Sequence, residues 1–394
     1  MGDEKNFGML PEGPLGVIAL DGCQALGAKV DNYLVEWRKT RGANNPIAMT
    51  YEGYDRDSYL VETKVPRFGS GEGKGVIETS VRGDDLYIMV DVCNYSLTYS
   101  LRGQQNHMSP DDHFQNLKRI IAAVGGKAKR ITVIMPFLYE SRQHKRNGRE
   151  SLDCALGLQE LVKMGVDQIL TFDAHDPRVQ NAIPLTGFET FNPNYQFIKA
   201  MVKAEPDLQI DSDHMMVIST DEGGMGRAIY LANVLGLDVG MFYKRRDYSR
   251  IVNGRNPIVA HEFLGTDVEG KDLIIIDDMI SSGESVLDVA KELKRRKARK
   301  VFVCSTFGLF TNGLHKFDEY HQNGLIDRIF TTNLIYQTPE LLSRPYYTSV
   351  DMSKYIALII DYLNHGMSVS ELLNPVDRIN KCLDKFKAEK NKEN

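Results

Sequence analysis

The feature that most constrains this chain is a regular alternation, from about residue 86 onward, of short apolar runs with amphipathic stretches. The apolar runs are nearly continuous and rich in β-branched residues, as expected for strands that are buried on both faces. The stretches between them have helical patterns, and several end at a glycine. The apolar runs are 86–92, 131–137, 168–174, 215–220, 239–243, 273–278, 301–307 and 329–334. This alternation predicts an α/β fold with central, mostly parallel sheets.

The length of the chain and its polar stretches predict how it divides into domains. A chain of 394 residues is long enough for two or three domains with substantial cores. The turn-rich stretch 189–192 predicts a boundary near residue 190, so we expect an N-terminal domain over 1–188 and a C-terminal domain over 189–394 with a helical extension at its end. Residues 94–112 predict a polar loop, and the charged tail from Lys385 predicts a frayed end.

Charge and cysteine usage limit the class of protein. The formal net charge of −5 argues against a nucleic-acid partner, because phosphate backbones select basic surfaces. The five cysteines are scattered and form no CxxC motif, which indicates free thiols in a reducing compartment. No basic amino-terminal region precedes an apolar run, and no apolar stretch approaches the roughly 20 residues that span a bilayer. We therefore expect a soluble, cytoplasmic protein with no membrane partner.

The most informative motif is LIIIDDMISSGES at 273–285, in which a buried strand ends in Asp277 and Asp278. In open α/β sheets, ligands bind at the carboxyl ends of strands, and a helix amino terminus there is suited to phosphate. The two acids can hold the hydroxyl groups of a sugar or a metal bound to them. The alternative is an Asp that caps an ordinary helix. The loop residues that open the helix are Ser281, Ser282, Gly283 and Ser285.

Two other strand ends carry candidate ligands. Asp173 and His175 lie at the end of one apolar run, and strand alternation predicts that both side chains lie on the same face, where they could share a metal ion such as Mg²⁺. His175 would be an unusual or water-mediated ligand, since Mg²⁺ prefers oxygen, and a structural role is the alternative. Asp221 follows another run beside Gly223 and Gly224, which allow close approach of the backbone to a ribose or metal, or simply form a turn.

A group of cations, Lys244-Arg245-Arg246, follows the run 239–243 and precedes a Gly-, Asn- and Pro-bearing stretch. This composition is typical of a lid over a site, although three adjacent cations also suit a solvated face. The chain contains no GxxxxGK[ST] motif, which argues against a P-loop kinase.

The loop at 277–285 resembles the phosphoribosyl-pyrophosphate-binding loop of type I phosphoribosyltransferases. That family usually has two acids, two apolar residues and then Asp-Thr-Gly-Gly-Thr. In this chain Ser281 replaces the Asp, Ser282 and Ser285 replace the Thr residues, and Glu284 replaces the second Gly. Further segments resemble, in order and spacing, the phosphoribosyl pyrophosphate synthetase family: RFGSGE at 67–72, VRGDDLYIMV at 81–90, LYESRQHKR at 138–146, TFDAH at 171–175, STDEGG at 219–224 and KRRDYSR at 244–250.

The resemblance implies two phosphoribosyltransferase-like domains that bind ATP and ribose 5-phosphate with Mg²⁺, in homo-oligomers that are often hexamers. It implies that Phe68 stacks on adenine and that Glu72 accepts from its amino group, although a phenylalanine is more often simply a core residue. Arg142 and Gln143 would grip the base or a phosphate, or form part of a solvated basic loop.

The same resemblance assigns the remaining roles. The C1 hydroxyl of ribose 5-phosphate attacks the β-phosphorus of ATP, and Lys244 and Arg246 stabilise the developing charge as catalytic residues. The metal is assigned to His175 and Asp221. Ribose 5-phosphate is assigned to Asp221, Asp277, Asp278, Ser281, Ser282, Gly283 and Ser285.

Two alternatives stay open. A type I phosphoribosyltransferase would not need ATP, and the adenine-like segment at 67–72 argues against it. A non-catalytic regulatory homologue would bind nucleotide or sugar phosphate and control a partner, whereas Lys244 and Arg246 argue for catalysis. The departures from the family pattern that keep this alternative open are Ser70, His144, Ser281 and Glu284.

Overall fold

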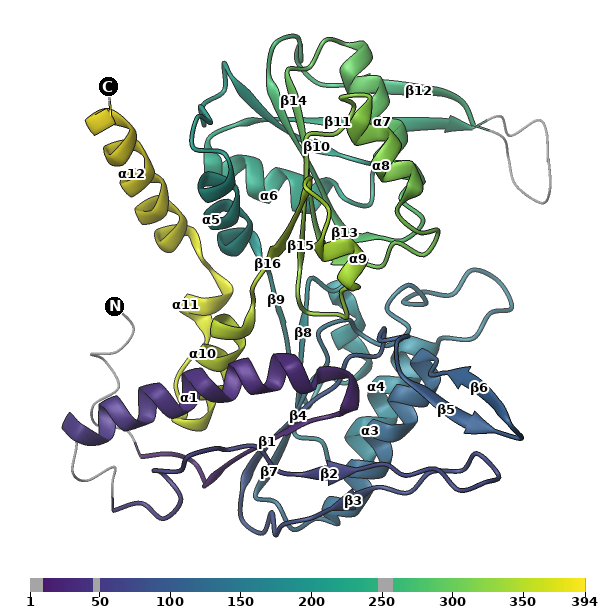
Figure 1. The fold of residues 1–394 in the computed structure, drawn as a ribbon, viewed down its shortest axis with the longest axis vertical. Helices are drawn as coiled ribbons and strands as arrows, with labels where there is room; N and C mark the ends of the chain where they lie inside the picture. Colours follow the sequence, from purple (N-terminus) through teal and green to yellow (C-terminus); the bar gives the residue numbers. More distant parts are fainter. Residues whose placement is uncertain (1–9, 45–49, 247–257, 394) are drawn as a thin grey trace. The chain divides into compact units, whose positions relative to one another are not determined.

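The computed structural model describes residues 10–393 apart from 45–49 and 247–257; for 42–44, 244–246, 258–261 and 391–393 it describes the backbone alone. The chain forms two compact units, each built on its own sheet (Figure 1). Unit 1 comprises 1–192, 333–336 and 351–374, and unit 2 comprises 193–332, 337–350 and 375–394. The expected α/β fold with mostly parallel sheets is confirmed, whereas the division into domains at 188 and 189 stays a prediction.

Unit 1 contains a five-stranded parallel sheet in the order β1-β4-β7-β8-β9. Its strands are β1 (Leu15–Ala19), β4 (Asp85–Met89), β7 (Arg130–Ile134), β8 (Gln168–Phe172) and β9 (Gly187–Phe191). Its helices are η1 (Asp21–Cys23), α1 (Gln24–Asn44), α3 (Pro110–Val124), α4 (Asp153–Lys163), η2 (Pro177–Ala182), α10 (Ser353–Asn364) and α11 (Ser370–Leu373). The apolar runs predicted at 86–92, 131–137 and 168–174 become β4, β7 and β8.

Helix α10 belongs to unit 1 although it lies near the end of the chain, and two buried arginines of α1 hold it there. The Nη1 of Arg41 donates to Asp361 Oδ1 at 2.9 Å, across 320 positions of sequence. Arg38 donates to Asn364 and packs between the rings of Tyr54 and Tyr59. These charge-assisted contacts fix the two helices against each other, because removing Asp361 or Asn364 leaves a buried guanidinium group without its partner on α10.

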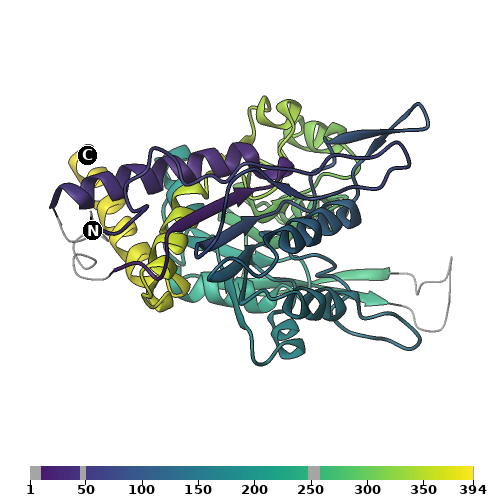
Figure 2. The same cartoon turned by 90° about the horizontal axis from the view of Figure 1, so that it is seen from below.

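Two hairpins extend from unit 1 (Figures 1 and 2). One pairs β2 (Thr63–Lys64) with β3 (Val76–Ile77), and the other pairs β5 (Thr98–Leu101) with β6 (Gln104–His107). The second hairpin lies at 98–107 within the segment 94–112, and α3 begins at Pro110, so the prediction of a polar loop over this segment is wrong. In β5, half-buried Tyr99 and Leu101 alternate with exposed Thr98 and Ser100, whereas β6 is mostly exposed.

Unit 2 contains a seven-stranded sheet in the order β12-β11-β10-β13-β14-β15-β16, parallel except for the antiparallel pair β11 and β12. Its strands are β10 (Met215–Ser219), β11 (Asp238–Arg246), β12 (Ile258–Leu264), β13 (Asp272–Ile280), β14 (Lys300–Gly308), β15 (Arg328–Thr332) and β16 (Tyr347–Val350). All five apolar runs predicted from residue 215 onward are strands here.

The helices of unit 2 are α5 (Asn194–Ala204), α6 (Met225–Leu235), α7 (Glu284–Arg295), α8 (His315–Gln322), α9 (Pro339–Leu342) and α12 (Val376–Glu393). The tail from Lys385, which we expected to be frayed, is instead the last part of α12, whose earlier residues Ile379 and Leu383 are buried against the core. Among the described residues, every helix is too short or too polar to cross a membrane.

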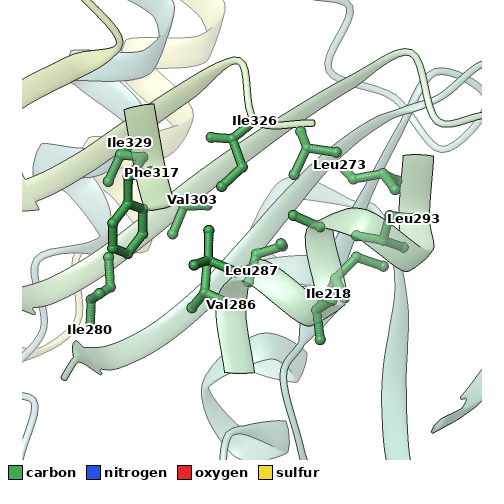
Figure 3. Packing of buried hydrophobic residues seen from close by; sticks show 14 of the residues in the cluster. Ile218, Leu273, Ile280, Val286, Leu287, Leu293, Val303, Phe317, Ile326 and Ile329 are labelled. Atoms are coloured by element: carbon green, nitrogen blue, oxygen red, sulfur yellow. The ribbon is translucent and has the colours of Figure 1, made fainter. Parts of the chain in front are cut away.

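The core of unit 2 lies directly beneath the segment that joins β13 to α7. Figure 3 shows Val286 and Leu287 of α7 among Ile280, Val303 and other strand residues, all at most 2% exposed. Burial of an aliphatic side chain of this kind stabilises the fold by about 1.5–3 kcal/mol. The loop between these elements therefore rests directly on a fully buried core.

Candidate active site

The loop after β13 is shaped by its contact with the core of unit 2. The strand continues through both acids to Ile280, two residues beyond the predicted run, and α7 begins at Glu284. Gly283 has φ +84°, and a Cβ there would lie 2.2 Å from the Phe317 ring. Only glycine fits this position, because it combines a left-handed backbone with direct contact to a buried ring. The loop therefore presents the amino terminus of α7 in one conformation.

The two acids of β13 lie in a poorly solvated position. Asp278 is 4% exposed, and its Oδ1 accepts from the Met279 amide at 2.9 Å. Burial, followed by the charge of Asp278, raises the pKa of Asp277 to about 7, while a hydrogen bond from Thr220 partly opposes this. The Thr220 Oγ1 donates to Asp277 Oδ2 at 2.9 Å. A ligand that brings hydroxyl donors or positive charge to this pair relieves the mutual repulsion.

Thr220 is a site residue that sequence reasoning missed. Strands β10 and β13 are parallel neighbours in which Ser219 pairs with Ile276, so the next residues, Thr220 and Asp277, lie side by side. The register of the two strands, rather than any motif, is the signal that would have identified it.

Asp221 follows β10 and starts the turn that leads into α6. Its side chain is exposed, its Oδ1 accepts from the Gly224 amide at 3.2 Å, and its carbonyl oxygen accepts from Ser219 Oγ at 2.7 Å. Because β10 and β13 are adjacent, the acids predicted at these two strand ends belong to the same edge of the unit 2 sheet. A carboxylate fixed through one oxygen keeps the other available to a ligand.

The serine residues of the loop are neither fully buried nor fully exposed. Ser281, Ser282 and Ser285 are half-buried, and Ser282 Oγ accepts from the Glu284 amide at 3.4 Å. The Glu284 side chain is exposed. Its carboxylate therefore extends into solvent.

The predicted catalytic cations lie on β11. The apolar run 239–243 suggested that Lys244 and Arg246 come after the strand. The strand in fact continues to Arg246, so both residues are part of its end. The strand extends this far because it pairs with β12, where Lys244 is opposite His261. The side chains of Lys244 and Arg246 lie outside the described residues.

In unit 1, Phe68 stands on an exposed turn. The Phe68 amide donates to the Glu72 carbonyl at 2.7 Å, and the Gly71 amide donates to the Phe68 carbonyl at 2.8 Å. Phe68 is 53% exposed, so the alternative of an ordinary core residue is wrong. The Ser70 hydroxyl donates to Glu72 Oε2 at 2.7 Å and orients that carboxylate. The turn thus offers an aromatic face and a carboxylate to solvent.

The basic loop after β7 carries the other nucleotide candidates. Arg142 is exposed. Gln143 Nε2 donates to the carbonyl oxygens of Ser151 at 2.8 Å and Lys145 at 3.3 Å, and its amide donates to the Glu140 carbonyl at 2.8 Å. The nitrogen end of Gln143 therefore closes this loop, and its carbonyl oxygen is the end that can receive a donor from a ligand.

The expectation for Asp173 and His175 is wrong in its geometry. Strand β8 ends at Phe172, and Asp173 adopts φ +42°, so strand alternation no longer applies. Asp173 is buried, whereas His175 is exposed. The ring centroid of His175 lies 5.3 Å from that of His144, whose Nε2 is 3.6 Å from Asp176 Oδ2. His175 therefore lies beside the His144 ring from the loop after β7, and is not aligned with Asp173.

Among the residues that the structure describes, no three His, Cys, Asp or Glu side chains gather as a metal site. His175 belongs to unit 1 and Asp221 to unit 2. The carboxylates at the ends of β10 and β13 are hard oxygen donors, and the raised pKa of Asp277 indicates that positive charge would be stabilised there. The donor chemistry of this edge therefore fits Mg²⁺.

The fold and the acid pair before a hydroxyl-rich loop define a protein of the phosphoribosyltransferase type. A phosphoribosylpyrophosphate synthetase from Mycobacterium smegmatis has a similar structure, with a TM-score of 0.69 at 21% identity, covering 89% of this chain and 98% of that one.

Sequence comparisons identify the family within that fold. Residues 15–165 match the N-terminal domain of ribose phosphate pyrophosphokinase, and residues 251–374 match the phosphoribosyl synthetase-associated domain. A ribose-phosphate pyrophosphokinase of Mycoplasma genitalium is 31% identical over 311 residues, which are 77% of this chain and 84% of that protein. One from Vibrio parahaemolyticus is 27% identical over 319 residues, covering 80% and 92%. The chain belongs to the ribose-phosphate pyrophosphokinase family.

Proposed function

We propose that this protein transfers pyrophosphate from ATP to ribose 5-phosphate, giving phosphoribosyl pyrophosphate and AMP. The observation that carries the proposal is the acid pair of β13, placed directly before a hydroxyl-rich loop at the amino terminus of α7. The C1 oxygen of the sugar attacks the β-phosphorus, the bond between that phosphorus and the oxygen bridging to the α-phosphate breaks, and AMP leaves. Family membership supports the same reaction.

Unit 2 is the proposed sugar-phosphate side. The 5-phosphate accepts hydrogen bonds from amides at the start of α7 and from the hydroxyl groups of Ser281, Ser282 and Ser285. The ribose hydroxyls donate to Asp277 and Asp278. Thr220 fixes the orientation of the Asp277 carboxylate, because its hydroxyl already donates to one of the two oxygens.

Unit 1 is the proposed nucleotide side. Phe68 stacks on the purine, and the carboxylate of Glu72, oriented by Ser70, accepts from its amino group. Arg142 supplies positive charge to the base or to a phosphate. Gln143 contributes its carbonyl oxygen. In this proposal the N-terminal domain, 1–188, carries the ATP side and the C-terminal domain, 189–394, carries the ribose 5-phosphate side.

Asp221 is the proposed Mg²⁺ ligand of unit 2, and His175 is the proposed direct or water-mediated Mg²⁺ ligand of unit 1. The ion, when bound, neutralises charge on the phosphate oxygens. Lys244 and Arg246 stabilise the charge that develops on the transferred group. The resemblance also supports homo-oligomers, with hexamers as the first state to test, and the five scattered cysteines support a cytoplasmic location.

Phosphorus-31 NMR of the protein with ATP, Mg²⁺ and ribose 5-phosphate tests the reaction. We expect AMP and the diphosphate signals of phosphoribosyl pyrophosphate, and a loss of about 10²–10³ in turnover for Lys244→Ala. Lys203→Ala, which removes an exposed lysine of α5 in the same unit, is the matched control and should retain activity.

The other outcomes separate the alternatives. Binding of ATP and ribose 5-phosphate without turnover would indicate a regulatory homologue. Consumption of phosphoribosyl pyrophosphate with a free base, and no use of ATP, would indicate a phosphoribosyltransferase.

A further inference from the structure

Arg67, the residue before Phe68, is held on three sides. Its Nη1 donates to the Gly71 carbonyl at 3.1 Å, and its Nη2 donates to Asp112 Oδ1 at 3.1 Å. Its guanidinium carbon lies 4.6 Å from the centre of the Tyr99 ring. The side chain is only 14% exposed although its neighbour Phe68 faces solvent. Arg67 therefore joins the exposed turn to two other elements of unit 1.

The first of these elements is the amino terminus of α3. Asp112 and Ser109 form a reciprocal capping box: the Ser109 hydroxyl accepts from the Asp112 amide, and Asp112 Oδ2 accepts from the Ser109 amide at 3.0 Å. This leaves Asp112 Oδ1 directed at Arg67. A carboxylate fixed in a capping box cannot follow the guanidinium if the turn moves, so it acts as a rigid anchor.

The second element is the hairpin of β5 and β6. The Met108 amide donates to the Leu97 carbonyl at 2.9 Å and closes the base of the hairpin. Tyr99 meets the guanidinium of Arg67, and Leu101 lies so close to Gly71 that a Cβ at position 71 would be 3.2 Å from Leu101 Cδ1. The hairpin thus packs on the turn that carries Phe68 from one side while α3 anchors it from another.

We propose that Arg67 is a positioning residue for nucleotide binding and that the hairpin of β5 and β6 supports Arg67 and the turn that carries Phe68. The assignment rests on the proposed role of Phe68 and Glu72 in holding the base. A turn that is already fixed in its binding conformation loses little freedom when the base arrives, and this preorganisation increases affinity. Arg67 itself touches no substrate.

The test compares the two substrates in steady-state kinetics. Arg67→Met should raise the KM for ATP at least fivefold, and leave the KM for ribose 5-phosphate and the kcat at saturating ATP within twofold. Arg102→Met, which removes an exposed arginine from the tip of the same hairpin, is the matched control. Equal changes in both KM values, or no change in the KM for ATP, would overturn the proposal.

A second pair of variants tests the ring contact. Tyr99→Phe keeps the aromatic face above the guanidinium and should behave as the unmodified protein, whereas Tyr99→Leu should raise the KM for ATP. This pair decides the proposal if Arg67→Met fails to fold. The same effect in both Tyr99 variants would contradict it.

Calorimetric titration with ATP separates this inference from the proposed function, because binding needs no turnover. A protein that binds ATP without turnover, and whose Arg67→Met variant binds at least fivefold more weakly, would contradict the proposed reaction and support the positioning role. Unchanged binding by a folded Arg67→Met variant would overturn the positioning role alone.

Discussion

The two units support their candidate ligand-binding residues in different ways. In unit 2, one continuous segment supplies the acids and the phosphate loop, and a packed core lies directly beneath it. In unit 1, the aromatic and acidic groups stand on an exposed turn that is tied to Asp112, 45 positions away in sequence. The difference teaches that a binding surface is made rigid either by the core below it or by side chains beside it. Each kind should respond differently to substitution.

The largest expected difference is in the free energy of unfolding lost when each of two glycines with a left-handed backbone is replaced by alanine. Gly283→Ala should destabilise the protein by about 2–5 kcal/mol, because it adds left-handed strain to a clash with the buried Phe317 ring. Gly71→Ala has the same kind of strain at φ +93° but meets only the end of Leu101, so we expect about 1 kcal/mol.

Chemical denaturation with urea measures both effects. Equal losses in the free energy of unfolding would contradict the contrast between a loop supported by a core and a turn supported by side chains.

A smaller effect should come from the acid pair and should depend on pH. The pKa of Asp277 is about 7 in the folded protein against 3.8 for a free side chain, so the folded state binds more protons between these values. Stability therefore falls as pH rises from about 4 to 7. Asp277→Asn removes this penalty and should stabilise the protein by about 1–3 kcal/mol at pH 8, with no gain below about pH 4.

Melting temperatures across this range provide the measurement. Asp221→Asn, which neutralises an exposed carboxylate on the adjacent strand end, is the control and should give a gain that does not grow with pH. A flat difference for Asp277→Asn would show that its carboxylate is well solvated.

The smallest expected effect belongs to the exposed turn. Phe68→Ala should weaken ATP binding about tenfold, the usual order for losing one aromatic ring from a stacked base, and leave stability nearly unchanged because the ring is half exposed. Tyr95→Ala, another exposed aromatic residue of unit 1, should retain affinity. Affinity titrations and melting curves of both variants would sharpen the comparison, and a large loss of stability in Phe68→Ala would break it.

The sequence predicted the features carried by one continuous segment better than those formed by contacts between separate segments. Buried parallel strands have a strong local pattern, and all eight predicted runs are strands. The acid pair and loop of unit 2 were predicted because they are contiguous. Thr220 was missed because its role depends on the register of β10 against β13. The prediction for Asp173 failed because the chain turns at that residue, which no residue pattern indicated.

The hairpin of β5 and β6 and the ties of Arg67 were also beyond sequence reasoning. The alternation in β5 covers only four residues, with Tyr99 and Leu101 half-buried between exposed Thr98 and Ser100, and β6 has no apolar residue, so the pattern is too short to predict a hairpin. The partners of Arg67 come from three separate segments, and only the folded structure brings them together. Sequence patterns therefore predict which strands are buried, but they do not predict which surface segments contact one another.

The placement of α10 in unit 1 has a consequence for how the chain folds. During synthesis, α1 emerges long before Asp361 and Asn364, which follow only after nearly the whole of unit 2 has been made. Until then the guanidinium groups of Arg38 and Arg41 lack the carboxylate and amide that they bind on α10, and closing so long a loop is slow. The amino-terminal unit therefore cannot complete its fold until α10 has been made, and a nascent chain released before Asp361 leaves both guanidinium groups without their α10 partners, a state that chaperones or proteases can recognise.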